Sequence, residues 1–262
     1  MNRIVISTDM DGTLLGHDSY DCTPALPLLD KLSKADIPVI LNTSKTAAEI
    51  QSWQQSLGLR LPAIVENGSA IVTPRGPPES PQEPELHIYG ASMVDLEAFL
   101  EELSPPGINF LTCALEIATG LTGLQGTALA AARDRRFSIP LKFFDLVAAK
   151  RFSEAAQARG LQCVQGGRFF SLQGQCDKGT TLKHLINRYQ QAWQSKVTVI
   201  ALGDNHNDLG MLNNADVPVV VKSLSGHLVT VPGPITIYTD NSAPDGWVEG
   251  VTRALATLSI QL

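Results

Sequence analysis

The sequence predicts an α/β protein with a mainly parallel sheet, into which a second, smaller α+β domain is inserted. Short apolar runs alternate with amphipathic stretches near both ends of the chain, which is typical of βαβ units. The alternation stops at a proline-rich segment and resumes near residue 178. The 262 residues are 44% hydrophobic and 18% charged, so the chain can bury a core of this kind. At roughly 150 residues per domain, this length suits one large domain or two modest ones.

The first part of the predicted sheet lies in the first 73 residues. Pro24 follows Thr23 at a first helical position and opens a helix, and Gly58 ends a later one. The expected strands and helices alternate as Ile4–Thr8, Thr23–Ala35, Pro38–Asn42, Thr46–Leu57 and Ala63–Val65.

Five prolines fall within the eleven residues Pro74–Pro84 and argue against a helix or a central strand there. We interpret this segment as a loop into the inserted domain, placed at residues 83–173, with the core domain at 1–82 and 174–262. The inserted domain should contain the helices Val94–Leu103, Ala128–Arg133 and Ser153–Arg159 and the strands Ile108–Thr112, Leu161–Gln165 and Phe169–Gln173.

The alternation of strands and helices resumes after the inserted domain. Helices are expected at Lys178–Gln191, Asp208–Asn213 and Asp245–Leu258, and strands at Val197–Leu202, Val217–Val221 and Ile235–Tyr238. The chain is therefore predicted as a Rossmannoid core, a parallel sheet between helices, interrupted by a cap.

Composition also limits the partners and the compartment. A net charge of −6 lacks the basic excess that nucleic-acid and anionic-membrane binders usually carry. Aliphatic runs such as Val197–Leu202 are far shorter than the roughly 20 residues that span a bilayer. The first residues lead directly into a strand-like run, and the four cysteines lie far apart. We therefore expect a cytoplasmic protein with reduced thiols that binds neither nucleic acid nor a membrane, and the oligomeric state stays open.

Two acidic clusters follow apolar strands. Asp9 and Asp11 come directly after the first strand, and Gly12 indicates a turn that lets both carboxylates face one crevice. An isolated pair of this kind is as often a solvated turn. Because Asp204 and Asp208 follow a second apolar strand, we favour a shared metal site, and paired carboxylates suit Mg²⁺.

Two further motifs lie between the acidic clusters. Thr43 follows the second strand, and Lys178 opens a later helix. A hydroxyl group and an ammonium group at such ends suit a phosphate, although each alone is more often a helix cap or a surface lysine. The order is informative: D-x-D, then T-S-K, then D-K-G, then G-D-x-x-x-D.

In this order the motifs resemble the haloacid dehalogenase superfamily of phosphatases, in the branch with a C2-type cap. The runs at 42–49, 66–71, 136–140 and 166–170 are similar to the mannosyl-3-phosphoglycerate phosphatases within it. The resemblance implies a Mg²⁺-dependent phosphatase that acts through an aspartyl-phosphate on a glycosyl-3-phosphoglycerate, with the mannosyl compound favoured. A broader sugar-phosphate phosphatase or a phosphomutase-like phosphotransferase is the alternative. A non-catalytic sensor or scaffold is disfavoured because Asp9 and Asp11 are both present.

The resemblance also implies roles for individual residues. Asp9 is expected as the nucleophile and Asp11 as the general acid, while Thr43 and Lys178 hold the phosphate oxygens. Mg²⁺ would be held by Asp9, the carbonyl group of Asp11, and Asp204, with Asp208 orienting metal-bound water or Lys178. The expected contacts to the rest of the substrate are Ser44, Lys45, Asn67, Arg135 and Arg168.

The chain differs from generic superfamily members in one core motif, and it departs from the pattern of the phosphoglycerate phosphatases at one place in the cap. Generic members carry T-G-R where this chain has T-S-K at 43–45. In the cap, Arg136 and Ile139 replace two acidic residues of the family's R-E-F-S-E-P pattern. The two cap replacements leave the sugar preference open and do not affect the core chemistry.

Overall fold

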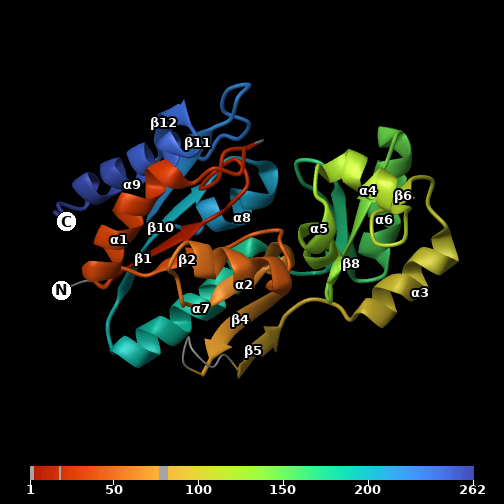
Figure 1. The fold of residues 1–262 in the computed structure, drawn as a ribbon, viewed down its shortest axis with the longest axis horizontal. Coiled ribbons are helices and arrows are strands. Elements are labelled where there is room, and N and C mark those ends of the chain that lie inside the picture. Colours follow the sequence, from red (N-terminus) through yellow and green to blue (C-terminus); the bar gives the residue numbers. More distant parts are fainter. Residues whose placement is uncertain (1–2, 18, 77–81) are drawn as a thin grey trace.

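The computed structural model describes residues 3–17, 19–76 and 82–262. Figure 1 shows two lobes, a larger one that contains both ends of the chain and a smaller one built from the middle of the chain. The larger lobe contains a five-stranded parallel sheet with the order β12-β11-β10-β1-β2. Its strands are β1 (Arg3–Thr8), β2 (Val39–Leu41), β10 (Val197–Gly203), β11 (Val217–Lys222) and β12 (Ile237–Ser242).

Helices cover both faces of this sheet because its strands are apolar on both sides. Along β1, Ile4 and Ile6 pack into one buried cluster with α1 and α9, whereas Val5 packs into another with α7 and α8. This is the alternation expected of a strand. The helices are α1 (Leu26–Lys34), α2 (Ala47–Ser56), α7 (Lys178–Trp193), α8 (Leu209–Leu212) and α9 (Asp245–Thr257), with short 3₁₀ turns at Thr23–Ala25, Glu66–Gly68 and His206–Asp208.

A small antiparallel sheet lies beside β2. It has the order β3-β4-β5, with β3 (Ala63–Val65), β4 (Ala70–Arg75) and β5 (Gln82–Ile88), and an isolated bridge between Asn42 and Ile64 places β3 next to β2. The expected loop at Pro74–Pro84 is therefore wrong at both ends, because Pro74 lies in β4 and Pro84 in β5. The register shifts between Thr73 and Arg75, beyond the end of β3, so both prolines occupy an irregular stretch that β3 does not pair. Pro77, Pro78 and Pro81 lie outside the described residues.

The smaller lobe, hereafter the cap, is an antiparallel sheet with helices. The sheet has the order β6-β7-β9-β8, and an apolar cluster from α3, α6 and these strands forms its own core. Its elements are α3 (Met93–Leu103), β6 (Ile108–Asn109), α4 (Leu115–Thr122), α5 (Gly126–Arg133), β7 (Ser138–Lys142), α6 (Leu146–Ala158), β8 (Leu161–Gln165) and β9 (Phe170–Gly174). The domain limits at residue 83 and residue 173 stay a prediction.

The sequence-based expectations are least accurate in the cap. Helix α4 and strand β7 were not expected, α6 begins at Leu146 instead of Ser153, and β6 is shorter than predicted. Helix α4 has Ala114 before it, with no side-chain cap, and β7 contains Pro140, so neither carries the usual signal. In the core, β12 begins two residues later than expected, and Thr23 opens a 3₁₀ turn ahead of α1 instead of capping the helix.

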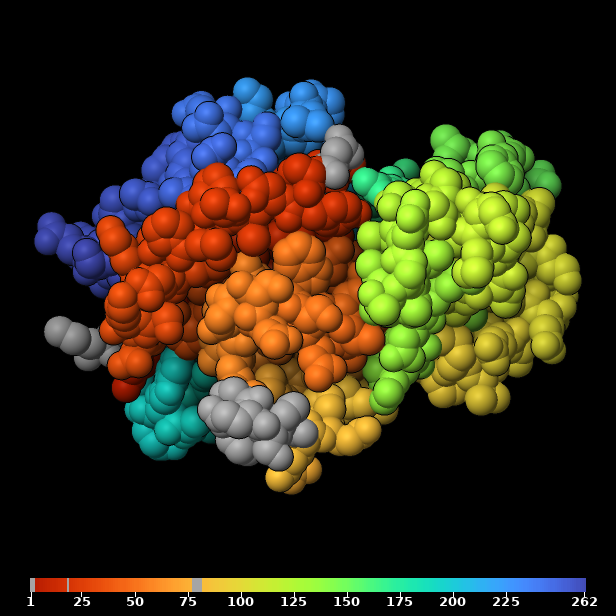
Figure 2. All heavy atoms as spheres, in the orientation of Figure 1, coloured from red at the N-terminus to blue at the C-terminus, as the bar shows by residue number. Residues whose placement is uncertain are grey.

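The two lobes touch on the face shown in Figure 2, where the segment around α5 lies against the segment around α2. A hydrogen bond from Thr46 Oγ1 to the Ala131 carbonyl oxygen, 2.8 Å, is one of the contacts. Across the described ranges of the chain, the helices are all too short or too polar to cross a membrane.

Trp247 fixes the end of β1 to the core. It is fully buried on α9, and its indole Nε1 donates to Thr8 Oγ1 at 3.0 Å. The Thr8 hydroxyl in turn donates to the Asp9 carbonyl oxygen at 2.7 Å. The backbone position of Asp9 therefore depends on a hydrogen-bond chain that starts in the C-terminal helix.

We predict that Trp247→Phe lowers the free energy of unfolding by ~1–3 kcal/mol, because the ring leaves a cavity and the Thr8 hydroxyl loses its donor. Urea unfolding followed by circular dichroism measures the change. Phe144→Leu, at a side chain that is 78% exposed, is the control and should change stability by less than ~0.5 kcal/mol. Equal stability of Trp247→Phe and the unchanged protein would contradict the anchoring role.

Candidate active site

Four chain segments that are distant in sequence meet at the carboxyl-terminal edge of the parallel sheet. Asp9 follows β1, Thr43 follows β2, Asp204 follows β10, and Lys178 is the first residue of α7. Parallel strands end at the same edge, so residues that follow them are brought together. The structure thus unites the four motifs that the sequence analysis singled out.

Lys178 lies between two carboxylates inside the protein. Its Nζ is 2.5 Å from Asp9 Oδ1 and 2.6 Å from Asp208 Oδ1, and the three side chains are at most 8% exposed. Burial lowers the pKa of Lys178, but the carboxylates of Asp208 and Asp9 outweigh it and raise that pKa above its usual range. Burial, followed by the neighbouring Asp208, raises the pKa of Asp9 despite the contact with Lys178.

Asp204 completes an acidic cluster with Asp9 and Asp208. One oxygen atom from each of the three buried carboxylates lies within 4.8 Å of the others. Burial and the charge of Asp208 raise the pKa of Asp204 to about 7, although the Thr13 hydroxyl donates to its Oδ1 at 3.0 Å. Gly12 has φ +81°, and a Cβ atom there would lie 2.9 Å from Asp204 Oδ2, so the turn after β1 requires glycine. Close, buried carboxylate oxygens of this kind suit a divalent cation such as Mg²⁺.

Asp11 faces a second lysine. Lys45 Nζ lies 2.8 Å from Asp11 Oδ2 and 3.9 Å from Glu49 Oε1. Burial lowers the pKa of Lys45, but Asp11 and Glu49 outweigh it and raise that pKa. Among the described residues, nothing hydrogen-bonds the buried Oδ1 atom of Asp11. One oxygen of this carboxylate is thus fixed by Lys45, and the other receives no hydrogen bond from the described part of the chain.

The turn after β3 contacts both the 43–45 loop and the cap. Glu66 and Asn67 both have positive φ, +48° and +56°, which costs energy for residues other than glycine. Their backbone N–H groups donate to the Lys45 and Thr43 carbonyl oxygens, at 2.9 and 3.0 Å, so the turn holds the 43–45 loop. The Asn67 side chain accepts a hydrogen bond from Asn207 Nδ2 at 3.2 Å.

The buried carboxylate of Glu66 binds the segment that leads into β7. It accepts hydrogen bonds from the backbone N–H groups of Arg136 and Phe137, at 3.1 and 3.2 Å, and from Ser138 Oγ at 2.6 Å. Glu66 was not expected as a functional residue, although it stands directly after a predicted strand. Glu66 is only 1% exposed, and its carboxylate accepts three hydrogen bonds from the other lobe. These hydrogen bonds fix the cap on the core.

The two cap arginines expected at the site are both present there. Arg135 Nη1 donates to the Ser44 carbonyl oxygen at 3.1 Å and to Ser138 Oγ at 3.0 Å. Arg168 Nη1 donates to the Thr122 carbonyl oxygen at 2.8 Å, within the cap. Of the two cap positions that depart from the R-E-F-S-E-P pattern, Ile139 is buried in the cap core and Arg136 is exposed, and neither lines the cavity.

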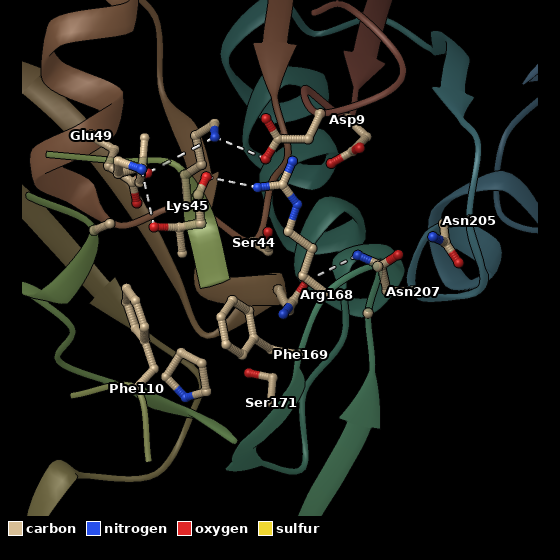
Figure 3. A pocket seen from close by; sticks show the side chains of 18 of the residues that line it. Asp9, Ser44, Lys45, Glu49, Phe110, Arg168, Phe169, Ser171, Asn205 and Asn207 are labelled. Carbon is tan, nitrogen blue, oxygen red and sulfur yellow. Dashed lines mark hydrogen bonds and ion pairs between the residues drawn. The ribbon is translucent and has the colours of Figure 1, made fainter. Parts of the chain in front are cut away.

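A cavity lies between the core and the cap (Figure 3). It is lined by eight of the expected residues: Asp9, Asp11, Ser44, Lys45, Asn67, Arg135, Arg168 and Asp204. Thr43, Lys178 and Asp208 are fully or almost fully buried beside it and do not line it. Residues that line it without having been expected include Tyr20, Glu49, Phe110, Phe169, Ser171, Asn205 and Asn207. Asn205 and Asn207 lie within the G-D-x-x-x-D motif and Phe169 beside Arg168, whereas Phe110 and Ser171 carry no sequence signal.

Comparison with known proteins agrees with this geometry. Residues 6–83 and 152–242 match the family described as haloacid dehalogenase-like hydrolase. The chain is 31% identical to a glucosyl-3-phosphoglycerate/mannosyl-3-phosphoglycerate phosphatase from Persephonella marina, covering 96% of this chain and 97% of that protein. It is 34% identical to a protein of the same name from Methanococcoides burtonii, covering 85% and 86%. A haloalkanoate dehalogenase superfamily phosphatase from Bacteroides thetaiotaomicron shares the fold, with a TM-score of 0.69, 16% identity, and 99% and 96% coverage.

We predict that, without metal, the Asp204→Asn variant is more stable than the unchanged protein, by a margin that increases with pH. The pKa of Asp204 is about 7 in the folded protein, against an ordinary 3.8, so folding disfavours the ionised form. The penalty begins near pH 4, where the unfolded chain releases this proton, and is complete above pH 7. The variant avoids the charge and keeps an acceptor for Thr13, so its advantage should grow to ~1–4 kcal/mol by pH 8, at ~1.4 kcal/mol per pKa unit.

Urea unfolding in EDTA at pH 4 to 8 measures this advantage, with Asp134→Asn, at an exposed cap residue, as the matched control. An advantage that does not change with pH would show that the charge of Asp204 is not penalised by burial.

Proposed function

Because the chain belongs to the haloacid dehalogenase-like hydrolases, we propose that it is a phosphatase that dephosphorylates glucosyl-3-phosphoglycerate or mannosyl-3-phosphoglycerate. The observation that carries the proposal is the position of Asp9, which lies at the end of β1, contacts Lys178 and lines the cavity. The names of the two relatives supply the substrate class. The cavity is lined by cationic, polar and apolar side chains from both lobes, which suits a ligand that carries a sugar, a glycerate and a phosphate.

Asp9 is the proposed nucleophile. Its carboxylate oxygen attacks phosphorus, and the bond from phosphorus to the glycerate oxygen breaks, which leaves an aspartyl-phosphate. Lys178, 2.5 Å from Asp9, keeps this carboxylate oriented and offsets negative charge that builds up nearby. Thr43, buried in the adjacent loop, maintains the backbone shape of the 43–45 segment through the contact of its Oγ1 with the Lys45 N–H group, 3.2 Å.

Asp11 is the proposed acid and base. It gives a proton to the leaving glycerate oxygen and later takes one from the water that hydrolyses the aspartyl-phosphate. Lys45 fixes one oxygen of the Asp11 carboxylate at 2.8 Å, which leaves Oδ1 for the reacting groups.

Mg²⁺ would be held by Asp9, Asp204 and the backbone carbonyl group of Asp11. When bound, it supplies positive charge that reduces the repulsion between the nucleophile and the phosphate. Asp208 binds Lys178 through Oδ1 and accepts from the N–H groups of Asp204 and Asn205 through Oδ2, at 3.1 and 3.0 Å. Its proposed role is therefore to position Lys178 and the loop that carries Asp204.

The carboxylate of the glycerate requires a separate cation. Arg135, Arg168 and Lys45 all line the cavity, and a guanidinium group can bind a carboxylate through two hydrogen bonds. Ser44 and Asn67 lie on the core side of the same cavity and offer further polar contacts. These five residues are the proposed binding set for the phosphoglycerate part of the substrate.

A substrate panel tests the function. The purified protein with Mg²⁺ should release phosphate from glucosyl- or mannosyl-3-phosphoglycerate far faster than from glucose 6-phosphate or mannose 6-phosphate. Asp9→Asn should reduce this release by several orders of magnitude without loss of folding, because the residue lies at a strand end. Equal rates on all sugar phosphates would indicate a broad phosphatase, and phosphate transfer to a sugar acceptor without release would indicate a mutase.

The acid role of Asp11 predicts a dependence on the leaving group. Asp11→Asn should slow the glycosyl-3-phosphoglycerate, whose alkoxide needs a proton, by ~100-fold or more beyond its effect on p-nitrophenyl phosphate. Steady-state kinetics on both substrates measures the difference. Equal losses on the two substrates would assign Asp11 to binding instead of proton transfer.

A further inference from the structure

The cap contributes a wall of the cavity that the chemistry described above does not use. Phe110, Phe169 and Ser171 all line the cavity, and Figure 3 shows them together at the end away from Asp9. The same wall includes Leu124 and Pro140. The cationic cap residues of the cavity are Arg135 and Arg168, and the rest of its cap lining is uncharged.

The hydroxyl group of Ser171 is buried and has no partner. The residue is only 7% exposed, and no described residue hydrogen-bonds its Oγ. In the β7–β9 pairing Ser171 lies opposite Pro140, which has no N–H group to offer. A buried hydroxyl group without a partner is costly, so its presence on a cavity wall indicates a polar group supplied by a ligand.

The two phenylalanines give this hydroxyl an apolar surrounding. The rings of Phe110 and Phe169 lie 5.2 Å apart between centroids at 48°. Phe110 belongs to a buried cluster, while Phe169 packs against that cluster and is only partly buried. An apolar surface beside a single hydroxyl group does not suit a phosphate or a carboxylate. It suits a neutral ring that carries both C–H groups and hydroxyl groups.

We propose that Phe110, Phe169 and Ser171 form the subsite for the hexose ring of the substrate. The ring of Phe169, which packs on the buried ring of Phe110, contacts the C–H face of the sugar, and Ser171 Oγ binds one of its hydroxyl groups. The proposal rests on the proposed function, since it assigns one part of the same substrate to this wall. It makes the three residues determinants of specificity that act at a distance from the reacting phosphate.

The test compares substrates with and without the sugar. 3-Phosphoglycerate keeps the phosphate and the carboxylate but lacks the hexose, and p-nitrophenyl phosphate lacks both the hexose and the carboxylate. Ser171→Ala should lower kcat/KM for the glycosyl-3-phosphoglycerate by about 2- to 12-fold, the value of one neutral hydrogen bond. Phe169→Leu, which keeps apolar volume but removes the ring, should lower it by about 3- to 10-fold. Both variants should leave the rates on the two sugar-free substrates unchanged within about twofold.

Two matched cap variants serve as controls. Ser153→Ala removes a hydroxyl group that already donates to the Cys163 carbonyl oxygen, and Phe144→Leu changes an exposed ring. Neither residue lines the cavity, so neither variant should change any of the rates. Thermal unfolding midpoints of all four variants show whether the cap is intact.

The outcomes separate the subsite from the function. Parallel losses on all substrates would assign Ser171 and Phe169 to cap stability, and full activity on the glycosyl substrate would place the sugar elsewhere; either result overturns the subsite alone. If the unchanged protein does not prefer the glycosyl substrate to 3-phosphoglycerate, the proposed function and the subsite both fail.

Discussion

The arrangement of the active site depends on the buried ion pairs of Lys178. Asp9, Asp204 and Asp208 place carboxylate oxygens within 4.8 Å of one another, and burial strengthens their repulsion. Lys178 contacts two of them and offsets part of that repulsion. The start of α7 that carries it is held from two sides, because Asn42 Nδ2 donates to the Lys178 carbonyl oxygen at 3.1 Å and Gly68 lies against the Asp177 backbone. A Cβ atom on Gly68 would approach that backbone to 2.3 Å, so glycine is required for this contact.

Glu66 holds the two lobes together, as Lys178 holds the carboxylates of the site together. Its carboxylate is bound by the cap segment 136–138, while its backbone N–H group binds the loop that contains Lys45. The same two-residue turn, Glu66 and Asn67, therefore binds both the cap and the 43–45 loop. The Glu66 side chain is directed to the cap and the Asn67 side chain into the cavity. This arrangement requires positive φ angles at both residues, which are energetically unfavourable.

The sequence was sufficient to predict the core and most of its site, for identifiable reasons. Apolar strands mark their own positions, and polar residues that follow parallel strands must meet at one edge, so Asp9, Lys178 and Asp204 could be grouped without coordinates. The cap was harder to predict because α4 has no capping side chain and β7 contains a proline. Phe110 and Ser171 reach the cavity only through the pairing of strands in that sheet, and a single phenylalanine or serine carries no signal of such a role. Glu66 stands in a recognisable position, but its contact with the cap depends on a lobe arrangement that periodicity does not reveal.

The parallel pairing of β1 with β10 also has a consequence for biosynthesis. Asp9 and Lys178 are 169 residues apart in the chain, so the ribosome adds Asp9 long before its partner. Until β10 is made, β1 lacks one of its two neighbours in the sheet. The cap, whose strands and helices are close in sequence and have an apolar core of their own, can fold during this interval. A nascent chain that stops after the cap thus exposes one unpaired edge of the apolar strand β1, which is the kind of surface that chaperones bind.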